Sequence, residues 1–104
     1  MNQNERGESF SGLCCVEVSG EGCAACLTLM PVLQDVIARR EDLKLIHVEA
    51  NEENKHLLTA WEVDRAPTVL LMDGGEIFAR CHGYQPEEIL EIWIDAKLEE
   101  HRKR

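Results

Sequence analysis

The hydrophobic pattern of this chain changes its period at a pair of cysteines. Residues 13–18 form a short, largely apolar run, which ends at Ser19-Gly20-Glu21-Gly22, and from Cys23 onward apolar residues recur at helical spacing. A short apolar run bounded by a turn is typical of a buried strand, whereas apolar residues at helical spacing are typical of a helix that covers a sheet. The sequence therefore predicts a strand that leads through one turn into a helix opened by Cys23-Ala24-Ala25-Cys26.

A second strand and helix follow the first pair. We expect the first helix to reach about Arg40 and to bend at Pro31, because proline removes one backbone hydrogen bond. The run at residues 43–48 predicts a second strand, and the segment that starts at Asn51 suits the start of a second helix. Two strands joined by a helix favour parallel pairing. The apolar face of the first helix is predicted to contain Leu29, Leu33, Val36 and Ile37, widened by Ala25, Leu27, Met30 and Val32.

The second half of the chain predicts a hairpin and a covering helix. Pro67 opens an apolar strand, and Asp73-Gly74-Gly75 signals a tight turn, so residues 76–82 should return antiparallel. Gly83 ends this strand, and Pro86 at a first helical position begins the last helix. The residues predicted to share the apolar face of that helix are Ile89, Trp93 and Ala96.

The predicted order of elements is βαβα followed by ββα. This order is typical of the α/β class and favours a central mixed sheet of four to five strands flanked by helices. A length of 104 residues, of which 44% are hydrophobic, fits a single domain over residues 1–104 with its own core. Residues 1–12 are polar and contain Gly and Ser, so we interpret them as a flexible lead-in.

The acidic charge of the chain argues against several classes of partner. A net charge of −9 and a pI near 4.8 repel nucleic-acid phosphates and anionic lipid headgroups. No apolar run approaches the roughly 18–20 residues of a membrane span, and the N-terminal residues lack the apolar core of a secretory signal. We therefore expect a cytoplasmic protein with no nucleic-acid or membrane partner, whose cysteines are buried, bind metal or carry out redox chemistry.

Cys23 and Cys26 carry the strongest chemical signal among the five cysteines. Unpaired backbone N–H groups and the positive end of the dipole at a helix start stabilise an anion, so the Cys23 thiol should ionise more readily than an ordinary thiol. Residues three apart on a helix are neighbours, so Cys26 can close onto Cys23 with little rearrangement. This arrangement is typical of a reversible dithiol, in which the first cysteine attacks a disulfide and the second releases the reduced product.

Residues 13–98 resemble the thioredoxin family. The features that carry the resemblance are Cys23-Ala24-Ala25-Cys26, Pro31, Ala66-Pro67-Thr68, the turn Asp73-Gly74-Gly75-Glu76, and Gly83. The resemblance implies the thioredoxin fold, with Cys23 as the nucleophile and Cys26 as the resolving cysteine. It also implies that Glu17 is a buried acid that relays a proton to Cys26, and that Pro67 is cis. The residues that it implies for substrate binding are Gly22, Ala66, Pro67 and Gly83.

The function that follows from this resemblance is that of a thiol-disulfide oxidoreductase that reduces protein disulfides. The resemblance implies disulfide-containing protein substrates and a thioredoxin-reductase-like electron donor. It implies no cofactor besides the redox-active dithiol of Cys23 and Cys26. We expect a monomer that acts in electron transport and cell redox homeostasis.

Two other functions stay open at this stage. Ser19 and Gly22 stand where the family has aromatic residues, so the chain is alternatively a peptide-binding or scaffold module that uses the same groove without turnover. A metal-binding protein is the other alternative, although no second closely spaced pair matches structural zinc spacing. The candidate metal ligands are Cys14 or Cys15, Cys23, Cys26, Cys81 and His82.

The remaining cysteines and one histidine are interpreted as structural. Cys14 and Cys15 are adjacent in a predicted strand, so their side chains should point to opposite faces of the sheet and pack there. Cys81 lies in the last strand and is interpreted as a packed thiol. If it were exposed, that exposure would indicate a regulatory role. His47 stands where the family often has a lysine near the buried acid, and we interpret it as a half-buried strand residue.

Overall fold

The computed structural model describes residues 10–104, so the predicted lead-in of residues 1–12 lies mostly outside the described residues. The elements follow the predicted order closely. They are β1 (Leu13–Ser19), α2 (Ala24–Ala38), β2 (Lys44–Glu49), the 3₁₀ helix η1 (Glu52–Asn54), α3 (Lys55–Trp61), β3 (Thr68–Asp73), β4 (Glu76–His82) and α4 (Glu87–Arg102). None of the helices in this part of the chain has the length and apolar character needed to cross a membrane.

The four strands of the described residues form one mixed sheet in the order β2-β1-β3-β4. β1 and β2 pair in parallel, as expected for two strands joined by a helix, whereas β3 runs antiparallel to both β1 and β4. Gly74 and Gly75 close the β3–β4 hairpin, and both have a positive φ, which glycine adopts without steric cost. The predicted mixed sheet is therefore confirmed, with β1 in its centre.

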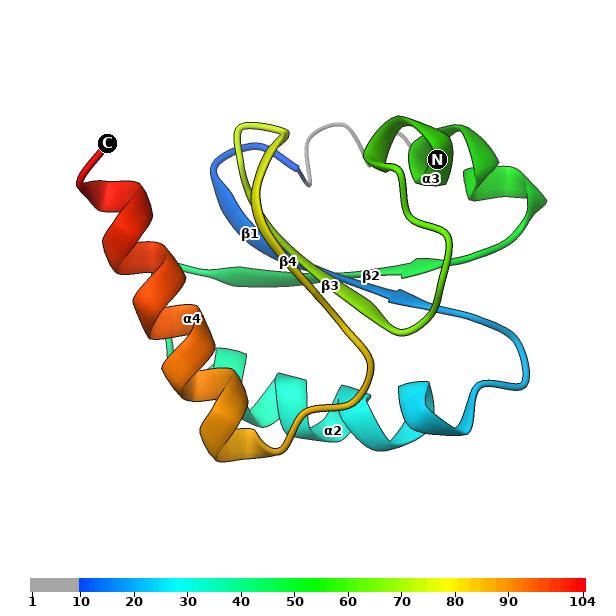
Figure 1. Ribbon diagram of the computed structural model, residues 1–104, viewed down its shortest axis with the longest axis horizontal. Coiled ribbons are helices and arrows are strands. Elements are labelled where there is room, and N and C mark those ends of the chain that lie inside the picture. Colours follow the sequence, from blue (N-terminus) through cyan, green and yellow to red (C-terminus); the bar gives the residue numbers. More distant parts are fainter. Residues whose placement is uncertain (1–9) are drawn as a thin grey trace.

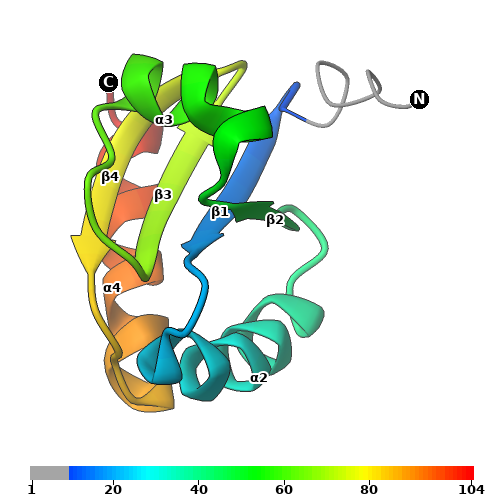
Figure 2. The same cartoon turned by 90° about the vertical axis from the view of Figure 1, so that its right-hand side faces the viewer.

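Helices cover the two faces of the sheet unequally. α2 and α4 lie on one face and α3 lies on the other (Figure 1, Figure 2). Successive residues of β1 alternate between these two layers, so Cys15 packs in the core under α2 and α4 while Cys14 packs in the core under α3. Both thiols are fully buried, and the predicted packing of the two cysteines on opposite faces is confirmed.

Two predictions about helix faces are wrong. In α4 the buried residues are Leu90, Ile94 and Leu98, whereas Ile89 is 48% exposed and Ala96 is exposed as well. Leucine and isoleucine at strict intervals of four form a continuous aliphatic stripe, and this stripe rather than its neighbour lies against the sheet. Trp93 lies at the edge of that core, half-buried. Pro86 immediately precedes α4 instead of forming its first residue. In α2 the predicted core residue Leu27 is 78% exposed.

Candidate active site

The turn between β1 and α2 places the two cysteines at a helix start. Gly22 has a φ of +68°, a conformation that glycine favours, and Cys23 is the N-cap residue of α2. The backbone N–H of Cys26 donates a hydrogen bond to Sγ of Cys23 over 3.2 Å. The sulfur of Cys23 therefore receives one of the N–H groups that the first turn of a helix leaves unpaired.

Cys23 and Cys26 form a disulfide whose Cα atoms lie 5.3 Å apart. The two sulfur-bearing residues differ in access: Cys23 is half-buried at the surface of the turn, whereas Cys26 is only 3% exposed. An incoming thiol or disulfide can therefore reach Cys23, while Cys26 lies behind it. This asymmetry suits an exchange in which the outer sulfur bonds to a partner and the inner sulfur displaces that partner.

The three free cysteines have the opposite chemical character. Burial raises the pKa of the Cys14 and Cys15 thiols, and it raises the pKa of Cys81 to about 11. Since the thiolate is the reactive form, these thiols are poor nucleophiles near neutral pH. Cys81 is partly buried against the core under α2 and α4, as the sequence interpretation expected of a packed thiol.

The loop before β3 lies against the turn that leads into the dithiol. The Ala66–Pro67 peptide bond is cis, as predicted. A Cβ atom placed on Gly20 would lie 3.3 Å from Cβ of Ala66, so the two loops are in close contact. On its other side the loop is held by Gly83, whose N–H donates to the Pro67 carbonyl over 2.8 Å. The structure thus brings three of the residues predicted for substrate binding together beside the β1–α2 turn, with Ala66 exposed, Gly83 partly buried and Pro67 buried.

Glu17 is a fully buried carboxylate on β1. Side chains of a strand alternate, so Glu17 shares the face of Cys15 and Ser19, which is the face that α2 covers. The Ser19 hydroxyl donates to Oε2 of Glu17, and Nδ1 of His47 lies 2.7 Å from Oε1. Both carboxyl oxygens therefore have polar partners, as a buried polar group requires.

His47 extends this polar contact toward the surface. Its Nε2 lies 3.1 Å from Oε2 of Glu49, and its side chain is 40% exposed. Burial lowers the pKa of His47, but the hydrogen bonds to Glu17 and Glu49 raise it, and the net pKa lies above the ordinary value of 6.5. The resemblance placed His47 near the buried acid, but its interpretation as an ordinary half-buried strand residue assigned it no contact with Glu17, which the structure shows.

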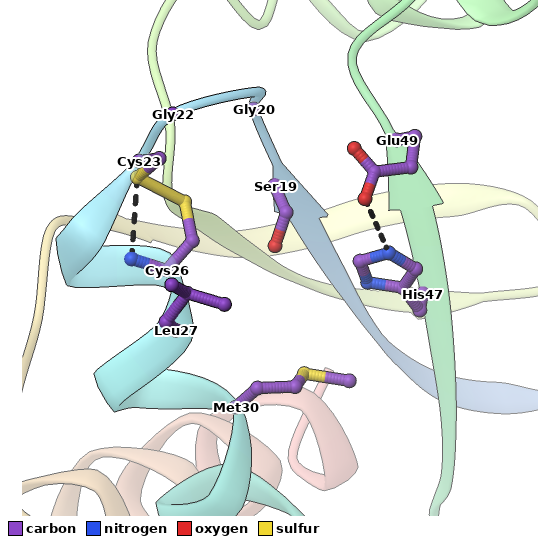
Figure 3. Close-up of a pocket in the computed structure, with 9 residues that line it drawn as sticks. All are labelled: Ser19, Gly20, Gly22, Cys23, Cys26, Leu27, Met30, His47 and Glu49. Carbon is purple, nitrogen blue, oxygen red and sulfur yellow. Dashed lines mark hydrogen bonds and ion pairs between the residues drawn. A yellow bond between two sulfur atoms is a disulfide. The ribbon is translucent and has the colours of Figure 1, made fainter.

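A pocket of about 310 Å³ opens beside the disulfide (Figure 3). Leu27 and Met30 form an apolar side of this pocket, and Ser19, His47 and Glu49 form a polar side. It is completed by Gly20, Gly22, Cys23 and Cys26. Of the predicted site residues it contains Gly22 and both cysteines, while Ala66, Pro67 and Gly83 do not line it.

The polar side of the pocket was missed from the sequence, although a signal for it exists. In the parallel pairing of β1 and β2, Glu17 lies opposite His47 and Ser19 lies opposite Glu49. Both strands carry their polar residues at alternate positions at the same end, so two polar pairs on one face follow once the register is known. The register itself depends on where the crossover helix returns the chain.

The metal-binding alternative finds no support in the described residues. Residues 10–104 contain no group of three or more His, Cys, Asp or Glu side chains arranged to hold a metal ion. Two of the ligands that the sequence offered, Cys23 and Cys26, are bonded to each other.

Comparison with known proteins agrees with this geometry. The model of the Thioredoxin family matches residues 6–96. The chain belongs to the thioredoxin family. A thioredoxin of Chlamydia pneumoniae is 32% identical over 89 residues, which cover 84% of this chain and 86% of the relative. A thioredoxin of Bacillus subtilis is 24% identical over 98 residues, which cover 93% of each chain.

Solved thioredoxin structures share the fold. A mutant thioredoxin from Halobacterium salinarum superposes with a TM-score of 0.76 at 25% identity, over 93% of this chain and 86% of that one. Thioredoxin from Aeropyrum pernix gives a TM-score of 0.77 at 14% identity, over 92% and 83% of the two chains. With the thioredoxin relatives and the close cysteine pair, this family member is a thiol-disulfide oxidoreductase that acts on protein disulfides.

Proposed function

We propose that this thioredoxin-family protein works as a reductant, with Cys23 as the nucleophile and Cys26 as the resolving cysteine. The observation that carries the proposal is the Cys23–Cys26 pair at the start of α2, with Cys23 accessible and Cys26 buried. In the reduced protein the Cys23 thiolate attacks a substrate disulfide, and one substrate sulfur leaves as a thiolate that takes up a proton. The product of this step is a mixed disulfide between Cys23 and the other substrate sulfur.

The second step releases the substrate. Cys26 loses its proton and attacks Sγ of Cys23, so the Cys23–Cys26 bond forms and the bond to the substrate breaks. We assign Glu17 as the base that accepts the Cys26 proton, since its buried carboxylate lies on the face that α2 covers and Ser19 and His47 hold it in place. The leaving substrate sulfur takes up a proton, which completes the reduction.

We assign substrate binding to Gly22, Ala66, Pro67 and Gly83. Gly22 precedes the nucleophile, and the Ala66–Pro67 loop contacts the turn at Gly20. A substrate chain laid along this loop would therefore pass close to Cys23. Tyr84 follows Gly83 and Leu27 follows Cys26, and the exposed side chains of both add apolar surface, which suits an unfolded or extended protein substrate.

The setting that this function implies is a chain of thiol exchanges. A thioredoxin-reductase-like flavoprotein supplies the electrons, and disulfide-containing proteins accept them. The redox group is the Cys23–Cys26 dithiol alone, within one domain of residues 1–104. We place the protein as a monomer in the cytoplasm, where it serves electron transport and cell redox homeostasis.

Reduction of insulin disulfides, with dithiothreitol as the electron donor, tests the proposal. The Cys23→Ser variant should lose activity over the uncatalysed background, because no thiolate then starts the exchange. Cys81→Ser is the matched control, since it removes a partly buried thiol outside the proposed site and should retain wild-type activity. Wild-type activity in Cys23→Ser, or a wild-type protein no faster than background, would overturn the proposal.

A further inference from the structure

Four polar side chains form a continuous group on the face of the sheet that α2 covers. We call Glu17, Ser19, His47 and Glu49 the polar quartet. Glu17 pairs with His47 and Ser19 pairs with Glu49 across the parallel β1 and β2 strands. Three quartet members line the pocket beside Cys26, whereas Glu17 is fully buried behind them. The quartet therefore reaches from the interior of the protein to the surface of the pocket.

The contacts within the quartet constrain where its protons are. An ionised carboxylate only accepts hydrogen bonds, and a neutral imidazole donates from just one ring nitrogen. His47 lies against a carboxylate at both nitrogens, at 2.7 Å from Glu17 and 3.1 Å from Glu49. As an imidazolium, His47 donates to both carboxylates. Once it has lost one proton, one ring nitrogen becomes an acceptor, and a proton that reaches Glu17 can then be donated to Nδ1 along the 2.7 Å contact.

We propose that His47 relays protons between the buried Glu17 carboxyl and the solvent in the pocket, and that it acts on the dithiol through Glu17 as a positioning residue. Nδ1 faces the interior and Nε2 faces Glu49 at the pocket wall (Figure 3). A proton that arrives at Nδ1 is thus matched by a proton that leaves from Nε2. This inference rests on the proposed role of Glu17 as the base for Cys26.

The relay completes the proton balance of the resolving step. When Cys26 attacks the mixed disulfide, its thiol proton passes to Glu17, and Glu17 passes a proton to the neutral His47 at Nδ1. The electron pair of Cys26 forms the bond to Cys23, and the bond between Cys23 and the substrate sulfur breaks. The substrate leaves as a thiolate and takes a proton from solvent. His47 then releases its Nε2 proton to the pocket, which leaves the proton on Nδ1, and exchange of the ring protons with solvent at its 40% exposed side chain returns the starting tautomer.

The charge around His47 sets the pH range of the relay. The charged groups that face it are Glu17 from β1 and Glu49 from its own strand, and across the pocket the Cys23–Cys26 pair faces it from the start of α2. The two carboxylates outweigh burial and raise the pKa of His47 above 6.5. Since the relay needs a neutral acceptor at Nδ1, resolution should accelerate with rising pH as His47 loses its proton.

The test measures the resolving step directly. Reduced protein is mixed with a peptide disulfide, the reaction is quenched in acid, and mass spectrometry follows the mixed disulfide between pH 5.5 and 8.5. The variants are His47→Gln and His47→Lys, and thermal unfolding checks that both are folded. Lysine keeps a cation beside Glu17 but stays protonated through this range, with an ordinary pKa near 10.4. It therefore separates a charge partner from a proton relay.

We expect wild-type resolution to rise with pH across the range of a histidine whose pKa is raised. Both variants should lose this rise and should resolve the mixed disulfide about tenfold more slowly than the wild type at pH 8. This loss is smaller than the roughly 10²–10⁴-fold that removal of a general base costs, because Glu17 remains. Glu49→Gln should move the rise to lower pH, because one of the carboxylates that raise the His47 pKa is removed.

Each other outcome has a definite meaning. A wild-type rate and profile in His47→Lys would overturn the relay, since charge alone would then suffice. Unchanged resolution in His47→Gln would overturn it as well. Glu17→Gln separates the two levels of the argument: if it resolves like the wild type, the assigned base is wrong and the relay falls with it, while the Cys23→Ser result still decides the reductase function.

Discussion

The contact between Gly20 and Ala66 offers a way to move the proposed substrate loop without touching the dithiol. Gly20 does not have a positive φ, so alanine fits its backbone, but the new Cβ would lie 3.3 Å from Cβ of Ala66. That separation is tighter than ordinary van der Waals contact, and neither carbon belongs to a flexible side chain. Gly20→Ala should therefore push the Ala66–Pro67 loop and the β1–α2 turn apart by a few tenths of an ångström.

The size of the effect follows from this displacement. A misplacement of about 1 Å costs on the order of 10²-fold in rate, so a shift of about 0.3 Å should cost roughly fourfold in kcat/KM for a protein disulfide. The loss of stability should stay at the low end of overpacking, about 1 kcal/mol. Gly75→Ala is the stability control: it strains a residue with a φ of +89° in the β3–β4 turn and should lower stability while kcat/KM is retained.

A second substitution on the other side of the contact should restore activity. Ala66→Gly removes the carbon that Gly20→Ala would meet, so the double variant relieves the crowding. The assay is a double-mutant cycle on kcat/KM for insulin reduction, with urea unfolding of each variant in parallel. We expect the double variant to be more active than the product of the two single effects. Additive effects, or full activity in Gly20→Ala, would refute a contact that positions the loop.

Three further predictions follow from the core, the histidine and the free thiols. Leu33→Ala should cost about 2–5 kcal/mol in urea unfolding, because Leu33 on the inner face of α2 is fully buried, and a loss below 1 kcal/mol would contradict its place in the core. Because the pKa of His47 is raised in the folded protein, its contribution to stability is full below about pH 6.5 and is lost as pH rises through the folded-state pKa. The free energy of unfolding of the wild type should therefore exceed that of His47→Gln by more at pH 5.5 than at pH 8.5. The same difference at both pH values would contradict this prediction. With a pKa of about 11, Cys81 carries roughly 300-fold less thiolate at neutral pH than a cysteine of pKa 8.5, so in the oxidised protein it should react with iodoacetamide more slowly than an exposed cysteine. Rapid labelling would contradict its burial.

Most of the fold follows from local sequence signals. The β3–β4 hairpin was predictable because Gly74 and Gly75 supply the positive φ of its turn, and β1 because an apolar run ends at a glycine-rich turn. The face of α4 was not predictable, since its sequence carries two overlapping apolar stripes. Only packing against the sheet selects Leu90, Ile94 and Leu98 over Ile89. Leu27 is a similar case: it lies in α2 as predicted, but it is 78% exposed at the wall of the pocket and not in the core.

Some features of the site depend on residues close together in the sequence, and others depend on residues far apart. The dithiol is local: two cysteines three residues apart at a helix start define it, and the sequence is sufficient. The cis Pro67 was predicted through the family resemblance, whereas its contact with Gly83 follows from the pairing of β3 with β4. The Glu17–His47 contact joins residues 30 positions apart and depends on the β1–β2 register, which no local pattern specifies.

The side chains around the dithiol show which parts of the chemistry need specific residues. The family's aromatic positions hold Ser19 and Gly22 here, yet Cys23 still sits at the helix N-cap with a backbone N–H on its sulfur. Nucleophile activation by a helix start is a property of the backbone, so it survives these replacements. Ser19 instead donates to Glu17 and leaves room for the pocket through which His47 meets solvent. In the proposed relay, the pocket beside Ser19 gives His47 its access to solvent, and His47 carries the proton between that pocket and Glu17.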